Sequence, residues 1–229
     1  MQVCFLGTEE RARFIHLQQL ASPGVVVVAR QPVGGPSTIE SMYEEYLYIP
    51  GMLEVVQAAE RDDFDAVITG CFGDPGLDAA RELVRIPVVG LGESSLLVAA
   101  MLGHRFSIIT VLDSVVWPLR HLAARVGVGE KLASVRAVGV SVATVREMDE
   151  STYQRIRGVS RRAIEEDGAD TLVPGCASMS FFADRLQDDL GIPVVHPLKV
   201  ALKTAELLVS CGLRHSRLAY PTVPKLAAV

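Results

Sequence analysis

The chain has 229 residues, a formal net charge of -5, and a composition that is 49% hydrophobic but only 6% aromatic. This length suits one large domain or two small lobes, and the abundance of Ala, Val and Leu is typical of a compact α/β protein. No basic stripe stands out, so nucleic acid is not expected as a partner. No apolar run approaches the roughly 18 residues of a membrane span, and the N-terminus lacks a signal-peptide pattern, so we expect a cytoplasmic protein without a membrane role.

The first predicted elements alternate between strand and helix. A strand at residues 2–6 precedes a helix at 9–20, and four consecutive valines at 25–28 predict the next strand. An unbroken apolar strand is typical of a parallel sheet covered on both faces. The following loop, residues 33–41, contains a helix-start signal of the capping-box type. Ser37 could be the N-cap residue, and the Glu40 side chain could accept a hydrogen bond back from it. Such a loop suits a ligand, although a plain connection fits it equally well.

The next segment ends in a cysteine. Residues 65–71 form a short apolar run closed by Gly70-Cys71, and Asp74 and Pro75 are suited to begin a helix that reaches about residue 83. Cys71 is therefore expected between the carboxyl end of a strand and the start of a helix, where free N–H groups favour a negative charge. We expect this position to lower the pKa of the thiol.

The alternation continues through the second half. Strands are predicted at residues 87–90, 105–110 and 132–138, and helices at 91–102, 114–124 and 151–167. Another Gly-Cys pair, Gly175-Cys176, then precedes a helix that reaches about residue 189. The last predicted helix begins after His196-Pro197 and ends near Cys211.

The two Gly-Cys segments are copies. Asp65–Cys71 returns as Asp170–Cys176 at a constant offset, and each copy is followed by a matching Ile-Pro-Val-Val segment. One half of the protein therefore resembles a rewritten copy of the other. A duplicated α/β unit can direct two equivalent thiols toward one substrate, whereas Cys4 and Cys211 lie outside the repeat and are expected to be structural.

Two matched thiols suit racemisation. A racemase that acts at a carbon beside a carbonyl needs a base on one face and an acid on the other, and a thiolate and a thiol can fill these roles. Two thiolates so close would repel, so the pair should share one proton. The histidines form no Cys-His motif, paired metal-ligand spacing is missing, and no lysine lies in a recognisable pyridoxal site. We therefore expect catalysis without a cofactor or metal. Small residues chosen for two tight turns are the competing explanation.

Several motifs carry a resemblance. Residues 70–81 are similar to the first cysteine motif of the hydantoin racemase family, within the aspartate/glutamate racemase superfamily. Residues 35–41, 87–93 and 174–179 resemble other motifs of that family, in the expected order. The match covers most of the chain.

The resemblance implies an α/β fold of two pseudo-symmetric flavodoxin-like lobes, each with a parallel sheet flanked by helices, and an active site between them. Residues 1–98 with 207–229 would form the first lobe, and residues 99–206 the second. Cys71 and Cys176 match the family's two catalytic cysteines, and a homo-oligomer is usual. The expected substrate-binding residues are Gly7, Pro36, Ile39, Phe72, Gly73, Thr110, Ala177 and His196.

The implied reaction is cofactor-independent racemisation of a 5-substituted hydantoin or of allantoin, which are small-molecule substrates. The chain departs from the family at residues 7–10, where Gly-Thr-Glu-Glu replaces an Asn-Pro-Asn-Thr/Ser loop, and at His196, where an acidic residue is common. His196 could face the cleft or be a buried, satisfied histidine. A maleate-isomerase-like or decarboxylase-like enzyme and a non-catalytic small-molecule binder are the alternative functions.

Overall fold

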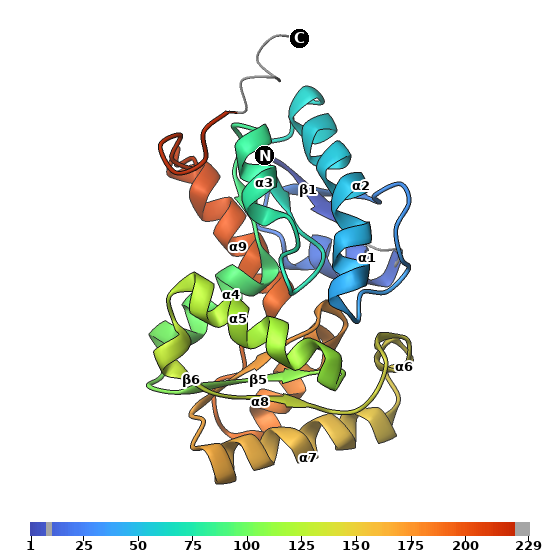
Figure 1. Cartoon of the computed structure of the whole chain (residues 1–229), viewed down its shortest axis with the longest axis vertical. Coiled ribbons are helices and arrows are strands. Elements are labelled where there is room, and N and C mark those ends of the chain that lie inside the picture. The colour runs from blue at the N-terminus through green and yellow to red at the C-terminus, as the bar shows by residue number, and fades with distance from the viewer. Residues whose placement is uncertain (8–10, 223–229) are drawn as a thin grey trace.

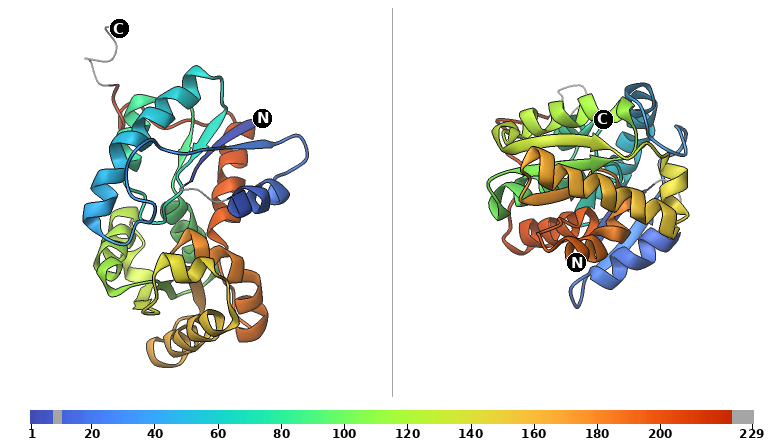
Figure 2. Two further views of the ribbon diagram at one scale, coloured as in Figure 1. Left: turned by 90° about the vertical axis from the view of Figure 1, so that its right-hand side faces the viewer. Right: turned by 90° about the horizontal axis from the view of Figure 1, so that it is seen from below.

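The computed structural model of the chain describes residues 1–7 and 11–222, which form two lobes, one above the other along the longest axis (Figure 1). Each lobe is built on one parallel sheet with helices against it, as the two turned views show (Figure 2). The strands of the first sheet are β1 (Gln2–Leu6), β2 (Val26–Arg30), β3 (Ala66–Ile68) and β4 (Val88–Val89). Those of the second are β5 (Phe106–Thr110), β6 (Leu132–Ala137) and β7 (Thr171–Pro174). The predicted α/β class with parallel sheets is confirmed.

Helices connect and cover these strands. In the first half they are α1 (Arg11–Leu20), α2 (Met42–Arg61), α3 (Leu77–Leu83) and α4 (Leu91–Leu102). In the second half they are α5 (Val116–Val126), α6 (Val142–Arg146), α7 (Glu150–Asp167), α8 (Ala183–Leu190) and α9 (Pro197–Ser210). Short 3₁₀ segments also precede other elements in the described residues, namely η1 (Asp113–Val115), η2 (Gly129–Lys131) and η3 (Ala177–Phe182).

The duplication seen in the sequence is also a duplication of topology. The first sheet has the order β2-β1-β3-β4 and the second β6-β5-β7, so β3 and β7 both lie beside the first strand of their lobe. An isolated parallel bridge between Leu172 and Val194 stands where β4 stands in the first sheet. The two Gly-Cys segments therefore end equivalent strands.

The strand β2 differs from its prediction. Its valine run indicated a strand covered on both faces, but β2 is an edge strand and Val26 is 51% exposed. The alternate residue Val27 is buried against the first-lobe core. Four valines in a row thus identified the strand correctly but not its place in the sheet.

The start of α2 lies one helical turn later than the sequence suggested. Ser41, not Ser37, is the N-cap: its Oγ accepts a hydrogen bond from the backbone N–H of Glu44 at 3.3 Å. The Glu44 carboxylate in turn accepts from the N–H of Glu40, one residue before the N-cap, at 2.7 Å and from Ser41 Oγ at 2.9 Å, in a variant of the capping box. The predicted helix-start signal therefore lies four residues too early, because Glu40 is held by contacts with the second lobe before the helix begins.

Asp74 caps a different helix from the one expected. The helix α3 begins only at Leu77, with Gly76 as its N-cap. The buried Asp74 carboxylate instead accepts hydrogen bonds from Gly92 N at 3.2 Å, from Glu93 N at 2.7 Å and from Thr69 Oγ1 at 3.1 Å. It therefore supplies the N-terminal cap that Gly90 cannot give α4.

Two helices join the lobes. α4 contacts α9, and its first residue, Leu91, belongs to the core of the first lobe, whereas Leu96 packs in the second. α9 returns to the first sheet, where Leu198 and Leu202 are fully buried. This packing would place most of α9 with the first lobe, and the predicted division at residues 98 and 206 stays a prediction. Within residues 1–7 and 11–222, no helix is long and apolar enough to cross a membrane.

Candidate active site

Each cysteine follows a glycine that the fold requires. A Cβ at Gly70 would overlap the carbonyl oxygen of Leu6 on the neighbouring strand, and a Cβ at Gly175 would lie 2.6 Å from Ile108 Cγ2. Neither position tolerates a side chain, because the strand end passes so close to its neighbour. Close approach of the neighbouring strand thus explains the two glycines, and it leaves the choice of cysteine at the next position open.

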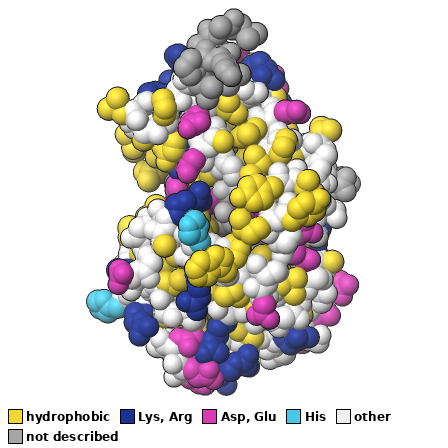
Figure 3. Space-filling view, in the orientation of Figure 1, with side chains coloured by type: hydrophobic (Ala, Val, Ile, Leu, Met, Phe, Trp, Pro, Cys, Tyr) yellow, Lys and Arg dark blue, Asp and Glu magenta, His cyan; other side chains and the backbone are white. Residues whose placement is uncertain are grey.

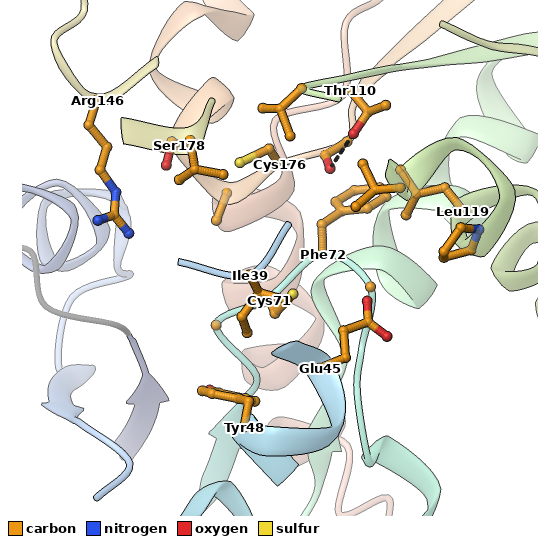
Figure 4. A pocket seen from close by; sticks show the side chains of 18 residues that line it. Ile39, Glu45, Tyr48, Cys71, Phe72, Thr110, Leu119, Arg146, Cys176 and Ser178 are labelled. Atoms are coloured by element: carbon orange, nitrogen blue, oxygen red, sulfur yellow. Dashed lines mark hydrogen bonds between the residues drawn. The ribbon is translucent and has the colours of Figure 1, made fainter. Parts of the chain in front are cut away.

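The two cysteines line one pocket. Figure 4 shows Cys71 and Cys176 facing this space from opposite sides, one from each lobe. The pocket encloses about 630 Å³ not filled by atoms, including its open mouth. It is lined by Ile39, Glu45, Tyr48, Gly70, Cys71, Phe72, Gly73, Thr110, Val111, Val115, Pro118, Leu119, Val142, Arg146, Gly175, Cys176, Ala177 and Ser178.

The loop before α2 reaches across the two lobes. Glu40 accepts a hydrogen bond through its side chain from the Val142 N–H, and its carbonyl oxygen accepts from Ser114 Oγ at 2.6 Å. Both donors belong to the second lobe. These contacts hold Ile39 at the wall of the pocket. Within this loop, Ile39 therefore contributes to the pocket lining.

The environment of Cys71 opposes ionisation. Burial raises the pKa of the Cys71 thiol, and the nearby Glu45 carboxylate raises it further. The N–H of Gly73 donates to the sulfur and acts in the opposite direction, but it does not prevail. The expected lowering of this pKa is thus wrong, because α3 begins six residues after Cys71 and the helix dipole acts only near the helix end.

Cys176 has a different local setting. It is itself the N-cap residue of η3, with extended φ and ψ angles of -150° and 137°. Thr110, at the end of β5, donates from its Oγ1 to the carbonyl oxygen of Gly175 at 3.4 Å, shown as a dashed line in Figure 4. The strand end that presents Cys176 is thereby tied to the neighbouring strand.

The structure brings together most of the predicted binding residues. The pocket lining includes Ile39, Phe72, Gly73, Thr110 and Ala177. It does not include Gly7, Pro36 or His196. Gly7 directly follows β1, where its N–H donates to the carbonyl oxygen of Arg30 at 3.2 Å, and Pro36 lies in the loop before α2. The remaining residues of the divergent loop, 8–10, lie outside the described residues.

Of the two alternatives for His196, the structure shows the second, a buried histidine whose ring nitrogens have partners. Its side chain is 6% exposed, and its Nδ1 accepts the N–H of Lys199, so it caps α9. Its Nε2 lies 3.1 Å from Nε2 of His16 on α1, and the two rings stack. Burial, with the charge of His16 adding to it, lowers the pKa of His196 to about 4.

Among the pocket residues that sequence reasoning missed are two on α2. Glu45 and Tyr48 lie three residues apart on α2 and therefore share a face of that helix. The signal was present as a helical spacing, but Pro50 inside the segment hides the helix from a pattern search. In the described part of the chain, no group of three or more His, Cys, Asp or Glu side chains could hold a metal ion.

Two duplicated parallel α/β lobes with a pocket between them place the chain in the class of two-lobed α/β proteins with a ligand site between the lobes. The family model of Asp/Glu/hydantoin racemases matches residues 14–205, and the chain belongs to this family. It is 40% identical to a hydantoin racemase of Pseudomonas sp. (strain NS671) over 192 residues, which cover 84% of this chain and 77% of that protein. A hydantoin racemase of Paenarthrobacter aurescens is 36% identical over 201 residues, covering 87% and 85% of the two chains. The protein is therefore an isomerase of the racemase type.

Solved structures agree with this assignment. An allantoin racemase from Klebsiella pneumoniae superposes with a TM-score of 0.91 at 31% identity, covering 97% of this chain and 94% of the other. An allantoin racemase from Pseudomonas fluorescens gives the same score at 30% identity, with coverage of 98% and 97%. An arylmalonate decarboxylase variant superposes at 0.68 with 15% identity, which shows a shared fold alone.

Proposed function

We propose that the protein is a cofactor-independent racemase of a 5-substituted hydantoin or of allantoin, with Cys71 and Cys176 as the acid and base. The observation that carries this proposal is the position of the two thiols, which come from equivalent strand ends of two lobes and line one pocket. The similarity to hydantoin racemases and allantoin racemases supports the substrate class.

The proposed reaction moves one proton off the substrate and one onto it. A thiolate removes the proton at C5, and the electron pair of that bond passes to the adjacent carbonyl as an enolate. The thiol on the opposite face then donates its proton to C5, which inverts the centre. The raised pKa of Cys71 keeps this thiol protonated, so a turnover that begins in this state uses Cys71 as the acid and Cys176 as the base. The protonation states are exchanged afterwards.

The remaining lining residues would hold the ring between the thiols. We propose that Ile39, Phe72, Gly73, Thr110 and Ala177 contact the substrate, since all five line the pocket. Phe72, 2% exposed, offers an apolar wall, and an apolar wall strengthens electrostatic interactions with an enolate. We do not assign substrate contacts to Gly7, Pro36 or His196, which stand outside this lining.

Two wider properties belong to the same proposal. A homo-oligomer is favoured by the exposed apolar side chains that gather over α2 and the start of α5 (Figure 3). They are Met42, Tyr43, Tyr46, Leu47 and Trp117. A cytoplasmic location is favoured by four free cysteines, because reducing compartments keep thiols unpaired. Light scattering of the purified protein tests the first property.

The substrate class is tested with single enantiomers of 5-benzylhydantoin, 5-methylhydantoin, allantoin and glutamate. Each is incubated with the metal-free protein, and optical rotation is followed. Decay of rotation with the hydantoins or allantoin, and none with glutamate, is the expected result. Racemisation of glutamate alone, or of none of the four, contradicts the proposal.

A further inference from the structure

Tyr48 is a buried side chain whose polar atom has no partner. The residue is 2% exposed, and its hydroxyl oxygen makes no hydrogen bond within residues 1–7 and 11–222. Leaving a buried hydroxyl unsatisfied costs about 1 to 3 kcal/mol. A native structure tolerates such a group where something outside the folded chain satisfies it.

The position of Tyr48 indicates what that partner is. The side chain lines the pocket from α2, on the same side as Cys71 and Glu45 (Figure 4). Its aromatic ring also packs in the core beneath the first sheet, with Leu6 and Met52. The ring is thus fixed by apolar contacts, and its hydroxyl is the part left for a ligand in the pocket.

The surroundings of Tyr48 favour its neutral, hydrogen-bond-donating phenol. Burial raises the pKa of Tyr48, and negative charge on the Cys71 thiolate or the Cys4 thiolate raises it further. Tyr48 therefore keeps its proton when the substrate is bound. A neutral phenol is a suitable donor for a carbonyl oxygen, whereas the neighbouring Glu45 is an acceptor when ionised.

We propose that the Tyr48 hydroxyl is a specificity-determining group that donates a hydrogen bond to a carbonyl oxygen of the ureide ring. This inference rests on the proposed function, because it takes the substrate to be a cyclic ureide. A site that offers a buried donor rejects a ligand without the matching acceptor, since the donor is then left unpaired. Tyr48 would thus select rings with a carbonyl on the Cys71 side of the pocket.

The direct test replaces Tyr48 by phenylalanine, which keeps the packed ring and removes only the hydroxyl. With single-enantiomer 5-benzylhydantoin, kcat/KM is expected to fall about tenfold in Tyr48→Phe. The exposed Tyr43 on the same helix provides the matched control, and Tyr43→Phe should leave kcat/KM within about twofold. An unchanged kcat/KM in Tyr48→Phe overturns the inference.

A stability measurement separates recognition from a structural role. Because the hydroxyl has no partner in the free protein, urea unfolding of Tyr48→Phe should give a free energy equal to or above that of the wild type. A clear loss of stability without substrate would mean that the hydroxyl is bonded within the protein, and the inference would be wrong.

The substrate side of the contact is tested with sulfur analogues. The 2-thio and 4-thio forms of 5-benzylhydantoin replace one carbonyl oxygen each with a weaker acceptor. The Tyr48→Phe penalty should disappear for one of these analogues and persist for the other. An equal penalty for the oxygen compound and both analogues contradicts a contact with either carbonyl.

Binding of unsubstituted hydantoin, which has no stereocentre, distinguishes this inference from the proposed function. Calorimetry should show weaker hydantoin binding to Tyr48→Phe than to the wild type, whether or not any substrate is racemised. Equal binding overturns the role of Tyr48 and leaves the racemase proposal standing. Absence of hydantoin binding to the wild type overturns both.

Discussion

Replacing Glu45 by glutamine should make Cys71 more reactive. The Glu45 carboxylate raises the pKa of the Cys71 thiol, second only to burial. Glu45 Oε1 and Cys71 Sγ both lie close to the position that a Cβ on Gly73 would take. The two atoms are therefore within about 6 Å of each other. At an effective dielectric constant of about 20, two unit charges at this distance repel by about 3 kcal/mol. Glu45 is partly exposed, so we expect solvent screening to leave about half of this repulsion energy. Removing the carboxylate charge should therefore increase the thiolate fraction of Cys71 about tenfold.

Alkylation measures this gain, because the thiolate is the reactive form. The protein is treated with iodoacetamide at mildly alkaline pH, which favours the ionised form of Glu45 against the rise in its pKa caused by burial. Mass spectrometry of the Cys71 peptide should show labelling about ten times faster in Glu45→Gln than in the wild type. Glu54→Gln, which removes an exposed charge from the same helix, is the control and should change nothing. An unchanged Cys71 rate in Glu45→Gln would refute the electrostatic reasoning.

Three further predictions concern stability. Gly175→Ala should lower the free energy of unfolding in urea by about 1 to 3 kcal/mol, because its Cβ would lie 2.6 Å from Ile108 Cγ2. A smaller loss would mean that the strand end can move. Asp74→Ala should cost about 3 kcal/mol, because it leaves two backbone N–H groups of α4 uncapped, and circular dichroism melting checks this loss. The low pKa of His196, about 4 when folded against about 6.5 when unfolded, contributes stability that is complete above pH 6.5 and is lost as the pH falls toward 4. Urea unfolding at both ends of this pH range should show a loss of about 2 to 3 kcal/mol in the free energy of unfolding. This loss should shrink in His196→Gln and persist in a variant of the exposed His104. An equal loss in both variants would contradict the assignment to His196.

The two cysteines could be located from the sequence because a duplication marks them twice. Cys71 and Cys176 end equivalent strands of parallel sheets, and the carboxyl ends of such strands form the ligand-binding edge. Local pattern and chain order were sufficient here. Thr110, which ends the strand beside β7, came only from the resemblance to the racemase family.

Features that depend on contacts between distant segments could not be predicted from local pattern and chain order. Asp74 follows the local rule for a helix cap, yet it caps α4, because the chain returns to it near Gly92. The pKa of Cys71 is raised first by burial and then by the approach of Glu45 from another helix, and both arise only in the folded chain. His196 meets His16 only once α1 and α9 have packed together. In each case tertiary contacts decide between local possibilities.

The central claim is that the two thiols serve opposite faces of one carbon, and enantiomer-specific proton exchange tests it most directly. Each enantiomer of 5-benzylhydantoin is incubated in deuterated water with Cys71→Ser and with Cys176→Ser, and deuterium at C5 is measured beside optical rotation. Both variants should lose racemisation. Each should still exchange the proton of one enantiomer with retention, and the two variants should exchange opposite enantiomers. Full racemisation by either variant, or exchange of the same enantiomer by both, would contradict the two-base account.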